Sequence, residues 1–367
     1  MDQHSTSAQP VGIGLIGAGV ISQIYLDNLT TRFANTRVVA VADIMPAAAA
    51  ARAEQYGVQA LTVSELLAHK DVEIVLNLTI PAAHAEVALA SIAAGKSVYN
   101  EKPMTGTREE GRSLLQEASE HGLRVGGAPD TFLGAGLQTV RTLLDAGAIG
   151  VPVAASGAML SSGHESWHPN PAFYYQPGAG PMLDMGPYYV TALVMLLGPI
   201  ARVSSTARAT RPTRTITSEP RNGETITVNT PSHIAATLDF ERGVIGTLTT
   251  SFDTYDTDHS LLTIYGSEGS VRLPDPNGFG GPVQLLRAGE KTWEDIPLVE
   301  GYTENSRGLG VADMARAIRE GGAHRASGDL AYHVLDVMHA TLESSELGCH
   351  IAIESRMERP DLLVTGL

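Results

Sequence analysis

A glycine-rich turn near the N-terminus constrains the fold of this chain more than any other feature. Residues 11–16 form an apolar run, Gly17-Ala18-Gly19 follows, and a helical pattern begins near Ile21. Gly17 permits a tight turn, Gly19 lets a ligand approach the backbone, and Ser22 is small enough for close helix packing. The positive helix N-terminus attracts phosphate. The pattern predicts a dinucleotide-binding strand, turn and helix. The residues expected to contact the dinucleotide here are Gly17, Gly19, Val20 and Ile21.

A carboxylate at the end of the next apolar run indicates which dinucleotide is bound. Asp43 follows residues 37–42, where it can accept hydrogen bonds from both ribose hydroxyls of NAD and would repel the 2′-phosphate of NADP. Ile44 and Met45 come next, so no arginine stands there to receive a phosphate. NAD is therefore the expected cofactor. The alternative is that Asp43 caps a helix starting near Pro46.

The first part of the chain alternates short β-branched runs with helical segments. This pattern predicts an α/β Rossmann domain with a buried parallel sheet. The expected strands are residues 11–16, 37–42, 74–78, 97–99 and 124–127, and the expected helices are 21–31, 46–56, 84–94 and 108–121.

After about residue 133, strand-like runs follow one another with few helices between them. This order predicts a second, α+β domain with a largely antiparallel sheet. Two domains also suit a chain of 367 residues. We expect an NAD-binding domain over residues 1–130 and a substrate-binding and oligomerisation domain over residues 131–367. The expected strands of the second domain are 151–160, 200–209, 233–240, 244–252, 261–265 and 283–286, and helices over 311–320 and 330–347 close the chain.

Composition limits the partners of the protein. A net charge of −15 would repel phosphate backbones and anionic membranes, so we expect no nucleic acid and no membrane partner. The start resembles no signal peptide, and no long uncharged apolar run occurs. Cys349 is the only cysteine, which favours a reducing compartment. These features predict a cytoplasmic protein that acts on a small molecule.

Two further segments carry a family resemblance. Tyr99-Asn100-Glu101-Lys102-Pro103 follows the predicted strand 97–99, and Gly180-Pro181-Met182-Leu183-Asp184-Met185-Gly186-Pro187-Tyr188 lies in the second domain. Together with the glycine-rich turn, they resemble the Gfo/Idh/MocA oxidoreductase family. The resemblance implies an open, predominantly antiparallel second sheet, a sugar or polyol substrate, and a homodimer or homotetramer formed through that sheet.

The same resemblance implies three catalytic residues. Lys102 matches the family's active-site lysine, whose ammonium would polarise the reacting C–O bond and contact both substrate and cofactor; the alternative is a solvated surface lysine. Its bond to Pro103 is cis in the family, although ordinary X-Pro statistics favour trans. Asp184 would orient the substrate hydroxyls.

Tyr188 stands where most of the family has histidine and some members have tyrosine. Since Asp184 and Tyr188 are four residues apart, one helix would present both on one face. Tyr188 would exchange the hydroxyl proton, which requires a phenol pKa below the usual value of about 10. Tyr189 falls on a different face. The alternative is that Tyr188 only packs in the helix.

A histidine-rich loop precedes these residues. His164-Glu165-Ser166-Trp167-His168 matches the HExxH pattern of zinc proteases, which requires a helix. Gly163 before the motif and Pro169 and Pro171 after it interrupt such a helix, so we expect no metal. The loop is better suited to sugar recognition through stacking faces and hydrogen bonds, with core packing or a subunit contact as the alternative. The expected substrate-binding residues here are His164, Trp167 and His168.

Several other residues are weaker candidates. Asn77, Pro81, His84 and Glu101 are expected beside the cofactor, although a histidine at a helix start is as often structural. Asp130 lies near the domain boundary, where it belongs either to the site or to the N-cap of the following helix. Arg307 and His333 either bind substrate or link the closing helices to the sheet.

The sequence predicts an NAD-dependent dehydrogenase or reductase. It would transfer a hydride between nicotinamide and a hydroxyl-bearing carbon of a sugar, polyol or glycoside. The alternatives are a redox-assisted glycosidase of the same family and a catalytically silent NAD-binding regulator.

Overall fold

The computed structural model describes residues 9–256 and 258–363, which form two compact units. The first unit contains residues 9–133, 305–331 and 363, and the second contains 134–304 and 332–362. The chain therefore returns to the first unit after completing most of the second. The domain boundary predicted between residues 130 and 131 lies close to the first change of unit. The prediction assigns residues 305–331 to the second domain, whereas the structure groups them with the first unit.

The first unit is built on a parallel sheet with strand order β3-β2-β1-β4-β5-β6. This order is that of dinucleotide-binding Rossmann folds. Its strands are almost wholly buried, apart from the edge strand β3, because helices cover the sheet. The strands are β1 (Val11–Ile16), β2 (Thr36–Ala42), β3 (Gln59–Leu61), β4 (Ile74–Asn77), β5 (Ser97–Asn100) and β6 (Val125–Gly127).

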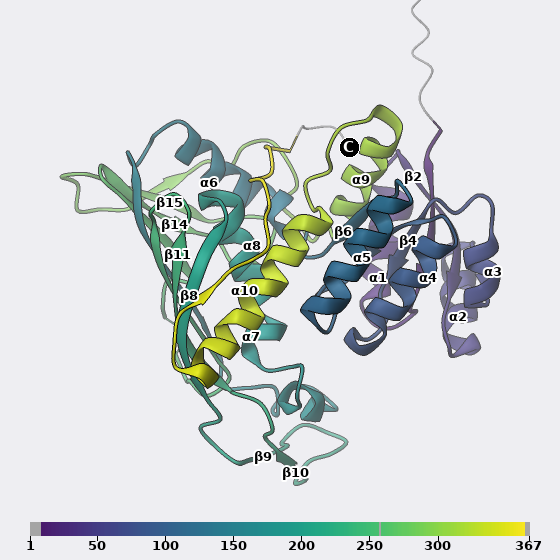
Figure 1. Cartoon of the computed structure of the whole chain (residues 1–367), viewed down its shortest axis with the longest axis horizontal. Coiled ribbons are helices and arrows are strands. Elements are labelled where there is room, and N and C mark those ends of the chain that lie inside the picture. Colours follow the sequence, from purple (N-terminus) through teal and green to yellow (C-terminus); the bar gives the residue numbers. More distant parts are fainter. Residues whose placement is uncertain (1–8, 257, 364–367) are drawn as a thin grey trace, which may run out of the picture. The chain divides into compact units, whose positions relative to one another are not determined.

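Except for α9, the helices of the first unit connect these strands as crossovers. Figure 1 shows α4 and α5, which lie side by side against the sheet. The sequence does not predict β3 and α3, because both are short and neither has more than one buried residue. The helices are α1 (Ser22–Thr31), α2 (Pro46–Tyr56), α3 (Val63–Ala68), α4 (His84–Ala93), α5 (Arg108–Glu120) and α9 (Leu309–Glu320), with short 3₁₀ turns at η1 (Pro81–Ala83) and η2 (Thr131–Leu133).

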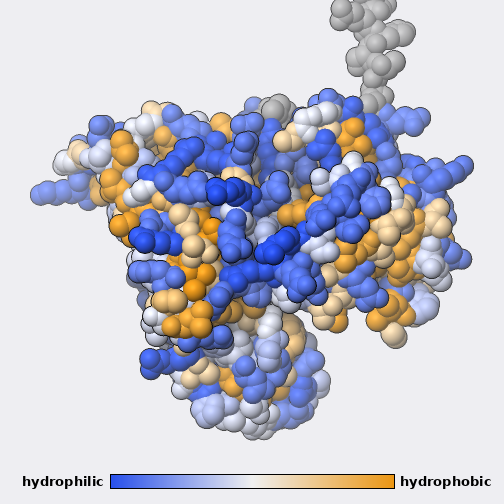
Figure 2. Space-filling view, viewed as in Figure 1, coloured by the Kyte–Doolittle hydropathy of each residue, from blue (hydrophilic) through white to orange (hydrophobic). Residues whose placement is uncertain are grey.

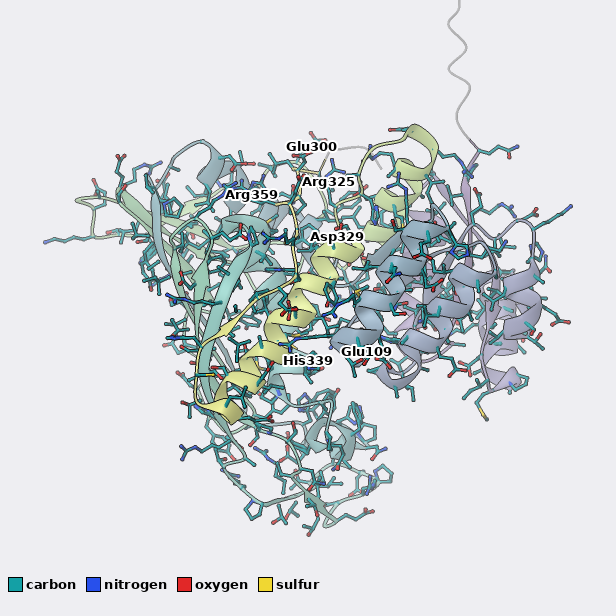
Figure 3. All side chains as sticks on the ribbon, viewed as in Figure 1. Glu109, Glu300, Arg325, Asp329, His339 and Arg359 are labelled. Carbon is teal, nitrogen blue, oxygen red and sulfur yellow. The ribbon has the colours of Figure 1, made fainter. Side chains whose placement is uncertain are left out.

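Helix α9 is bound to the Rossmann sheet by buried polar contacts. Asp130 accepts hydrogen bonds from the N–H groups of Gly308 and Gly310 at 2.9 and 3.0 Å, so it caps α9 and not the helix that follows it in the sequence. Within the same segment, Asp313 pairs with Arg325 at 2.5 Å, and Arg325 is labelled in Figure 3. Both side chains are buried, so the pair fixes the chain that leads from α9.

The second unit is built on a mixed sheet with strand order β16-β15-β14-β13-β7-β12-β11-β8-β17. Among the described strands of this sheet, only the pairing of β7 with β12 is parallel, so the predominantly antiparallel sheet is confirmed. The strands are β7 (Pro152–Leu160), β8 (Ile200–Arg208), β11 (His233–Phe240), β12 (Ile245–Ser251), β13 (Leu262–Gly266), β14 (Gly269–Leu273), β15 (Val283–Arg287), β16 (Glu294–Ile296) and β17 (Ile351–Ala352).

Helices pack against one face of this sheet. Strand β11 alternates buried and more exposed residues, as expected when only one face is covered. Ser205 of β8 donates its hydroxyl to the Thr341 carbonyl and so joins the sheet to α10. In the same unit, His333 of α10 is fully buried and lies 3.0 Å from the Ile200 nitrogen, so it links the closing helix to the sheet. The helices are α6 (Ala135–Asp145), α7 (Pro181–Asp184), α8 (Gly186–Leu197) and α10 (Gly328–Leu347), with a 3₁₀ turn at η3 (Pro171–Tyr175). The first four residues of α10 belong to the first unit.

A small hairpin stands apart from the main sheet. It consists of β9 (Thr213–Thr215) and β10 (Thr225–Thr227), labelled at the foot of Figure 1. The sequence pattern does not predict this hairpin. Its importance lies in Arg214, which the hairpin holds against the histidine-rich loop.

On the face drawn in Figure 2, hydrophobic residues are interspersed with hydrophilic ones, as on most globular proteins. Within residues 9–256 and 258–363, no helix combines the length and the apolar character that a membrane crossing requires.

Candidate active site

The glycine-rich turn has the conformation that a dinucleotide requires. Gly17 has φ +106°, and a Cβ there would lie 2.6 Å from the Leu78 carbonyl carbon, so only glycine is compatible with this position. A Cβ on Gly19 would meet open space. The two glycines thus have different structural roles. Gly17 adopts the positive φ of the turn, and Gly19 leaves its backbone accessible to a ligand. Val20 beside them is 93% exposed.

Asp43 supports the glycine-rich turn through both of its carboxylate oxygens. Its Oδ2 accepts the Ala18 N–H at 2.7 Å, and its Oδ1 accepts the Met45 N–H at 2.8 Å. The N-cap residue of α2 is Met45, with no side-chain cap, so Asp43 is not the N-cap of that helix. Each carboxylate oxygen keeps a further lone pair, which leaves capacity for a ribose hydroxyl.

Exposed apolar side chains surround this turn. Val20, Ile44, Met45 and Ile80 follow β1, β2 and β4, at the carboxyl edge of the parallel sheet where Rossmann ligands bind. Ile44 is 89% exposed and Ile80 is 69% exposed. A flat aromatic ring that covered these side chains would remove them from water. The residues present therefore fit a dinucleotide.

Glu101 holds the turn that carries Lys102. Its Oε2 accepts the Lys102 N–H at 2.8 Å, and its Oε1 accepts the hydroxyl of buried Tyr25 at 2.9 Å. The structure thus gives Glu101 a supporting role within the protein. Lys102 is half-buried, and its bond to Pro103 is cis, as the resemblance implied.

Asn77 and His84 lie beneath the surface. Both are fully buried, and Asn77 donates to the His84 carbonyl at 3.1 Å. The His84 ring nitrogens lie 2.7 Å from the Pro103 carbonyl and 3.0 Å from the Thr79 carbonyl. Their contacts connect the loop after β4 to the turn after β5. Of the residues predicted on this loop, Pro81 is the exposed one.

In the second unit, Asp184 and Tyr188 do not share one continuous helix as predicted. Asp184 ends α7, α8 begins at Gly186, and Met185 lies between them. Pro187 has no N–H to donate, so the helical hydrogen bonding is interrupted there. Asp184 is half-buried, whereas Tyr188 is only 7% exposed. Neighbouring Tyr189 is also buried, and burial raises its phenol pKa.

The histidine-rich loop does not form a helix, as the flanking glycine and prolines predict. Residues 164–168 form a turn in which the His168 N–H donates to the His164 carbonyl at 3.0 Å. Among the described residues, no three histidine, cysteine or acidic side chains are placed to hold a metal ion. His164 lies beside Asp184, with 3.7 Å between Nε2 and Oδ2.

Aromatic side chains surround His164. Its ring stacks on Tyr174 with 3.7 Å between centroids, and it packs nearly perpendicular to the Phe252 ring with 4.5 Å between centroids. Trp167 and Phe173 are 61% and 52% exposed, so both side chains are accessible to a ligand. His168 is half-buried, and its Nδ1 accepts the Asn170 N–H at 3.0 Å.

A buried arginine holds this loop in place through ion pairs, and no sequence pattern predicts its role. Arg214 pairs with Glu165 and with Asp253, and its side chain is 3% exposed. The other carboxylate oxygen of Glu165 accepts the Tyr175 hydroxyl at 2.7 Å. No local pattern indicates this cluster, because its members come from segments far apart in the sequence.

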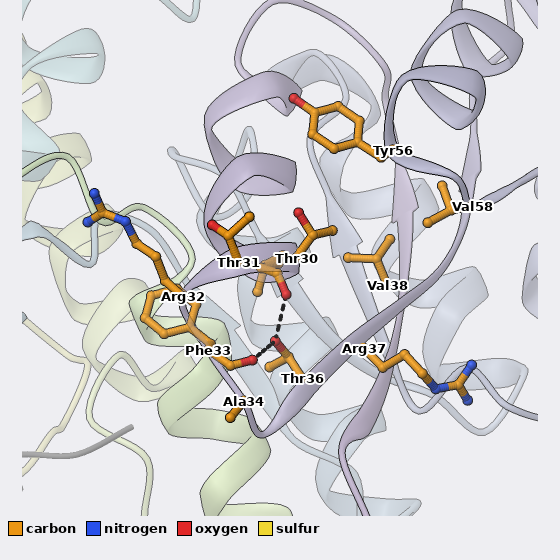
Figure 4. Close-up of a pocket in the computed structure, with 11 residues that line it drawn as sticks. Thr30, Thr31, Arg32, Phe33, Ala34, Thr36, Arg37, Val38, Tyr56 and Val58 are labelled. Carbon is orange, nitrogen blue, oxygen red and sulfur yellow. Dashed lines mark hydrogen bonds between the residues drawn. The ribbon is translucent and has the colours of Figure 1, made fainter.

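A hollow of about 390 Å³ lies elsewhere in the first unit, between the end of α1 and the start of β2 (Figure 4). The Thr36 hydroxyl there hydrogen-bonds to the carbonyls of Leu29 and Phe33, and Arg37 forms an ion pair with Asp71. None of the predicted site residues lines it.

The fold and the glycine-rich turn define a dinucleotide-binding protein with a second, sheet-based unit. Two family models match the chain: the oxidoreductase family with an NAD-binding Rossmann fold over residues 11–127, and the GFO/IDH/MocA C-terminal domain over residues 137–272. The chain belongs to the Gfo/Idh/MocA oxidoreductase family, and its first unit is an NAD-binding Rossmann fold.

Curated relatives include inositol 2-dehydrogenases. The Ralstonia nicotianae enzyme is 33% identical over 147 residues, which are 38% of this chain and 43% of that protein. The Salmonella paratyphi B enzyme is 28% identical over 169 residues, 44% of this chain and 50% of that protein. The matches thus span half or less of each relative's length.

A similar solved structure is levoglucosan dehydrogenase in complex with NADH and L-sorbose. It has a TM-score of 0.81 and 19% sequence identity, and the match covers 94% of this chain and 99% of that one. At this identity the likeness shows the fold alone.

Proposed function

We propose that the protein is an NAD-dependent dehydrogenase or reductase that acts on a hydroxyl-bearing carbon of a sugar, polyol or glycoside. The observation that carries this proposal is the arrangement around Asp184. Its half-buried carboxylate lies beside His164, and the loop that contains His164 also carries the exposed side chains of Trp167 and Phe173. Carboxylates accept hydroxyl hydrogen bonds, and aromatic faces stack on sugar rings. The family and its inositol dehydrogenase relatives support the same substrate class.

The proposed cofactor contacts are those of the first unit. The backbone at Gly17 and Gly19 would receive the pyrophosphate, and Asp43 the ribose. Val20, Ile21 and Pro81 would contact the rest of the dinucleotide, while Asn77, His84 and Glu101 support its binding loops from within the protein. When bound, NAD accepts or donates the hydride.

Lys102, Asp184 and Tyr188 are the residues proposed to act on the reacting hydroxyl. The Lys102 ammonium would stabilise negative charge that develops on the reacting oxygen. Asp184 would accept hydrogen bonds from substrate hydroxyls and orient them, with Trp167 and His168 as further substrate contacts and His164 beside Asp184. Tyr188 would hold the hydroxyl proton at its phenol oxygen, and Lys102 would take part in the proton transfer.

An NAD-reduction assay tests the proposal. Purified protein is mixed with NAD and a panel containing inositol, levoglucosan, monosaccharides and aryl glycosides, and NADH is followed by absorbance. Substrate-dependent NADH formation is expected from at least one polyol or sugar. Glycoside cleavage without net NADH would instead favour the redox-assisted glycosidase, and NAD binding with no turnover of any compound would favour the silent regulator.

We also propose that the protein is a cytoplasmic homodimer or homotetramer that associates through the sheet of the second unit. The more exposed face of this sheet carries Ile245 on β12 and Tyr265 on β13, side chains that burial against a second copy would stabilise. Light scattering after size-exclusion chromatography tests this proposal. A monomer at micromolar concentration would contradict it.

A further inference from the structure

His164 is the imidazole that lies beside the carboxylate assigned to the substrate. Its Nε2 is 3.7 Å from Asp184 Oδ2, slightly longer than a hydrogen bond, and a small side-chain rotation would close the gap. Such contacts are often long in ligand-free structures and shorten when the substrate binds. The two residues come from different elements, because His164 lies in the loop after β7 and Asp184 ends α7.

The structure holds the His164 ring in one place. It stacks on Tyr174, meets the edge of Phe252, and is 8% exposed. The next residue, Glu165, is bound by both Arg214 and Tyr175. A ring fixed from two sides loses little further freedom when it forms a hydrogen bond, so it can orient a neighbouring side chain.

The charge state of His164 follows from its surroundings. Burial lowers its pKa to about 4, although Asp184 and Glu165 act in the opposite direction, and His168 and Arg214 add to the lowering. The ring is therefore neutral at pH 7 and carries one N–H.

The position of that hydrogen follows from the two nitrogens. Nδ1 is buried and has no hydrogen-bond partner, whereas Nε2 faces the Asp184 carboxylate. Hydrogen on Nδ1 would leave a buried donor unpaired and would turn the Nε2 lone pair toward a negative oxygen, which is unfavourable on both counts. Hydrogen on Nε2 instead supplies a donor to the carboxylate.

We propose that His164 is a positioning residue whose Nε2–H holds Asp184 in the orientation that receives a substrate hydroxyl. This inference rests on the proposed function, because it takes Asp184 as a substrate contact. His164 then acts through Asp184 and need not accept the reacting proton itself.

Glutamine and asparagine variants test the position of the donor. Glutamine can place its amide near Nε2, whereas asparagine places it near Nδ1. With the polyol that the wild type oxidises, His164→Asn is expected to lower kcat by about 10- to 100-fold, the effect of losing a hydrogen bond to a charged group, while the KM for NAD is unchanged. His164→Gln should recover most of this loss. His233→Gln, on β11, is the matched control and should behave as wild type.

Equal kcat in wild type and His164→Asn would overturn the inference, as would a glutamine variant no better than the asparagine variant. A changed melting temperature accompanied by equal losses in both variants would mean a packing role only, and would also overturn it.

A second measurement does not require turnover. In protein with ¹⁵N-labelled histidine, the signal that disappears in His164→Gln identifies the residue. We expect Nε2 to be protonated and Nδ1 unprotonated, and Asp184→Ala to shift this signal while leaving that of His233 in place. A protonated Nδ1, or no response to Asp184→Ala, would refute the pairing. If the wild type oxidises no compound, the proposed function fails, and this measurement still decides whether His164 and Asp184 form the pair.

Discussion

The glycine-rich turn of the first unit and the histidine-rich loop of the second unit are built in opposite ways. The turn uses residues close in sequence, since Gly17, Ala18 and Asp43 span only the first two strands and their crossover. The loop depends on Arg214 and Asp253, which lie far along the chain from His164. The turn is specified by backbone conformation and the loop by buried charges, so mutations should affect the two by different mechanisms.

The largest effect is expected at Tyr188, where the chemistry is proposed. Tyr188→Phe keeps the ring and removes the hydroxyl, so kcat should fall by about 10²- to 10⁴-fold, the usual contribution of a positioned acid or base. Cofactor affinity should be unchanged, which steady-state kinetics and NAD titration measure. Tyr189→Phe is the control and should retain activity. Near-normal kcat for Tyr188→Phe would move the proton role to Lys102 or a histidine.

The next largest effect is expected where the loop is fastened. Arg214→Met should destabilise the protein by about 3–5 kcal/mol, because Glu165 and Asp253 would be left as buried, unpaired charges. Urea unfolding measures the change. The exposed pair Arg202–Asp239 provides the control, since Arg202→Met should cost about 1 kcal/mol or less. If Arg214→Met and Arg202→Met lowered the free energy of unfolding by similar amounts, the buried Arg214 cluster would contribute no more to stability than an exposed ion pair.

A smaller effect on stability is expected at the glycine-rich turn. Gly17→Ala should cost about 1–3 kcal/mol, because φ is positive and the added Cβ would meet the Leu78 carbonyl. Gly19→Ala should leave stability unchanged and weaken NAD binding, since its Cβ would point into open space. Thermal unfolding and calorimetric NAD titration separate the two effects. Normal NAD affinity in Gly19→Ala would argue against close approach of the cofactor at this residue.

A selectivity effect is expected at Asp43. The wild type should prefer NAD to NADP, and Asp43→Ala should lower kcat/KM for NAD by about 10-fold or more and narrow the preference, because a ribose hydroxyl loses a charged acceptor. The kcat/KM of Asp43→Asn for NAD should lie between those of the wild type and Asp43→Ala, since its amide oxygen can still accept the Ala18 N–H. Equal or better use of NADP by the wild type would refute the assignment.

No effect is expected from metal removal. The loop that carries the HExxH pattern forms a turn, so its histidines lack the helical arrangement that the zinc site requires. Chelator-treated and untreated enzyme should have the same kcat. Activity lost on chelation and restored by zinc would show that the loop binds a catalytic metal.

Elements whose signals are local can be predicted from the amino-acid sequence. The predicted strand over residues 11–16 and helix over residues 46–56 have the observed bounds, because an apolar run and a helical pattern each depend on neighbouring residues. The alternation of strands and helices was also sufficient for the Rossmann sheet. The short elements β3 and α3 were missed, since three to six mostly exposed residues carry little periodicity.

Contacts between residues far apart in the sequence could not be predicted and are known only from the folded structure. It placed Asp130 at the start of α9, buried His84 beneath the turn of Lys102, and separated Asp184 from the helix that carries Tyr188. It also brought Arg214 to Glu165 and His164 to Asp184. Side-chain pairs of this kind leave no periodic trace in the sequence, because the energy that stabilises them comes from burial and charge pairing after the chain has folded.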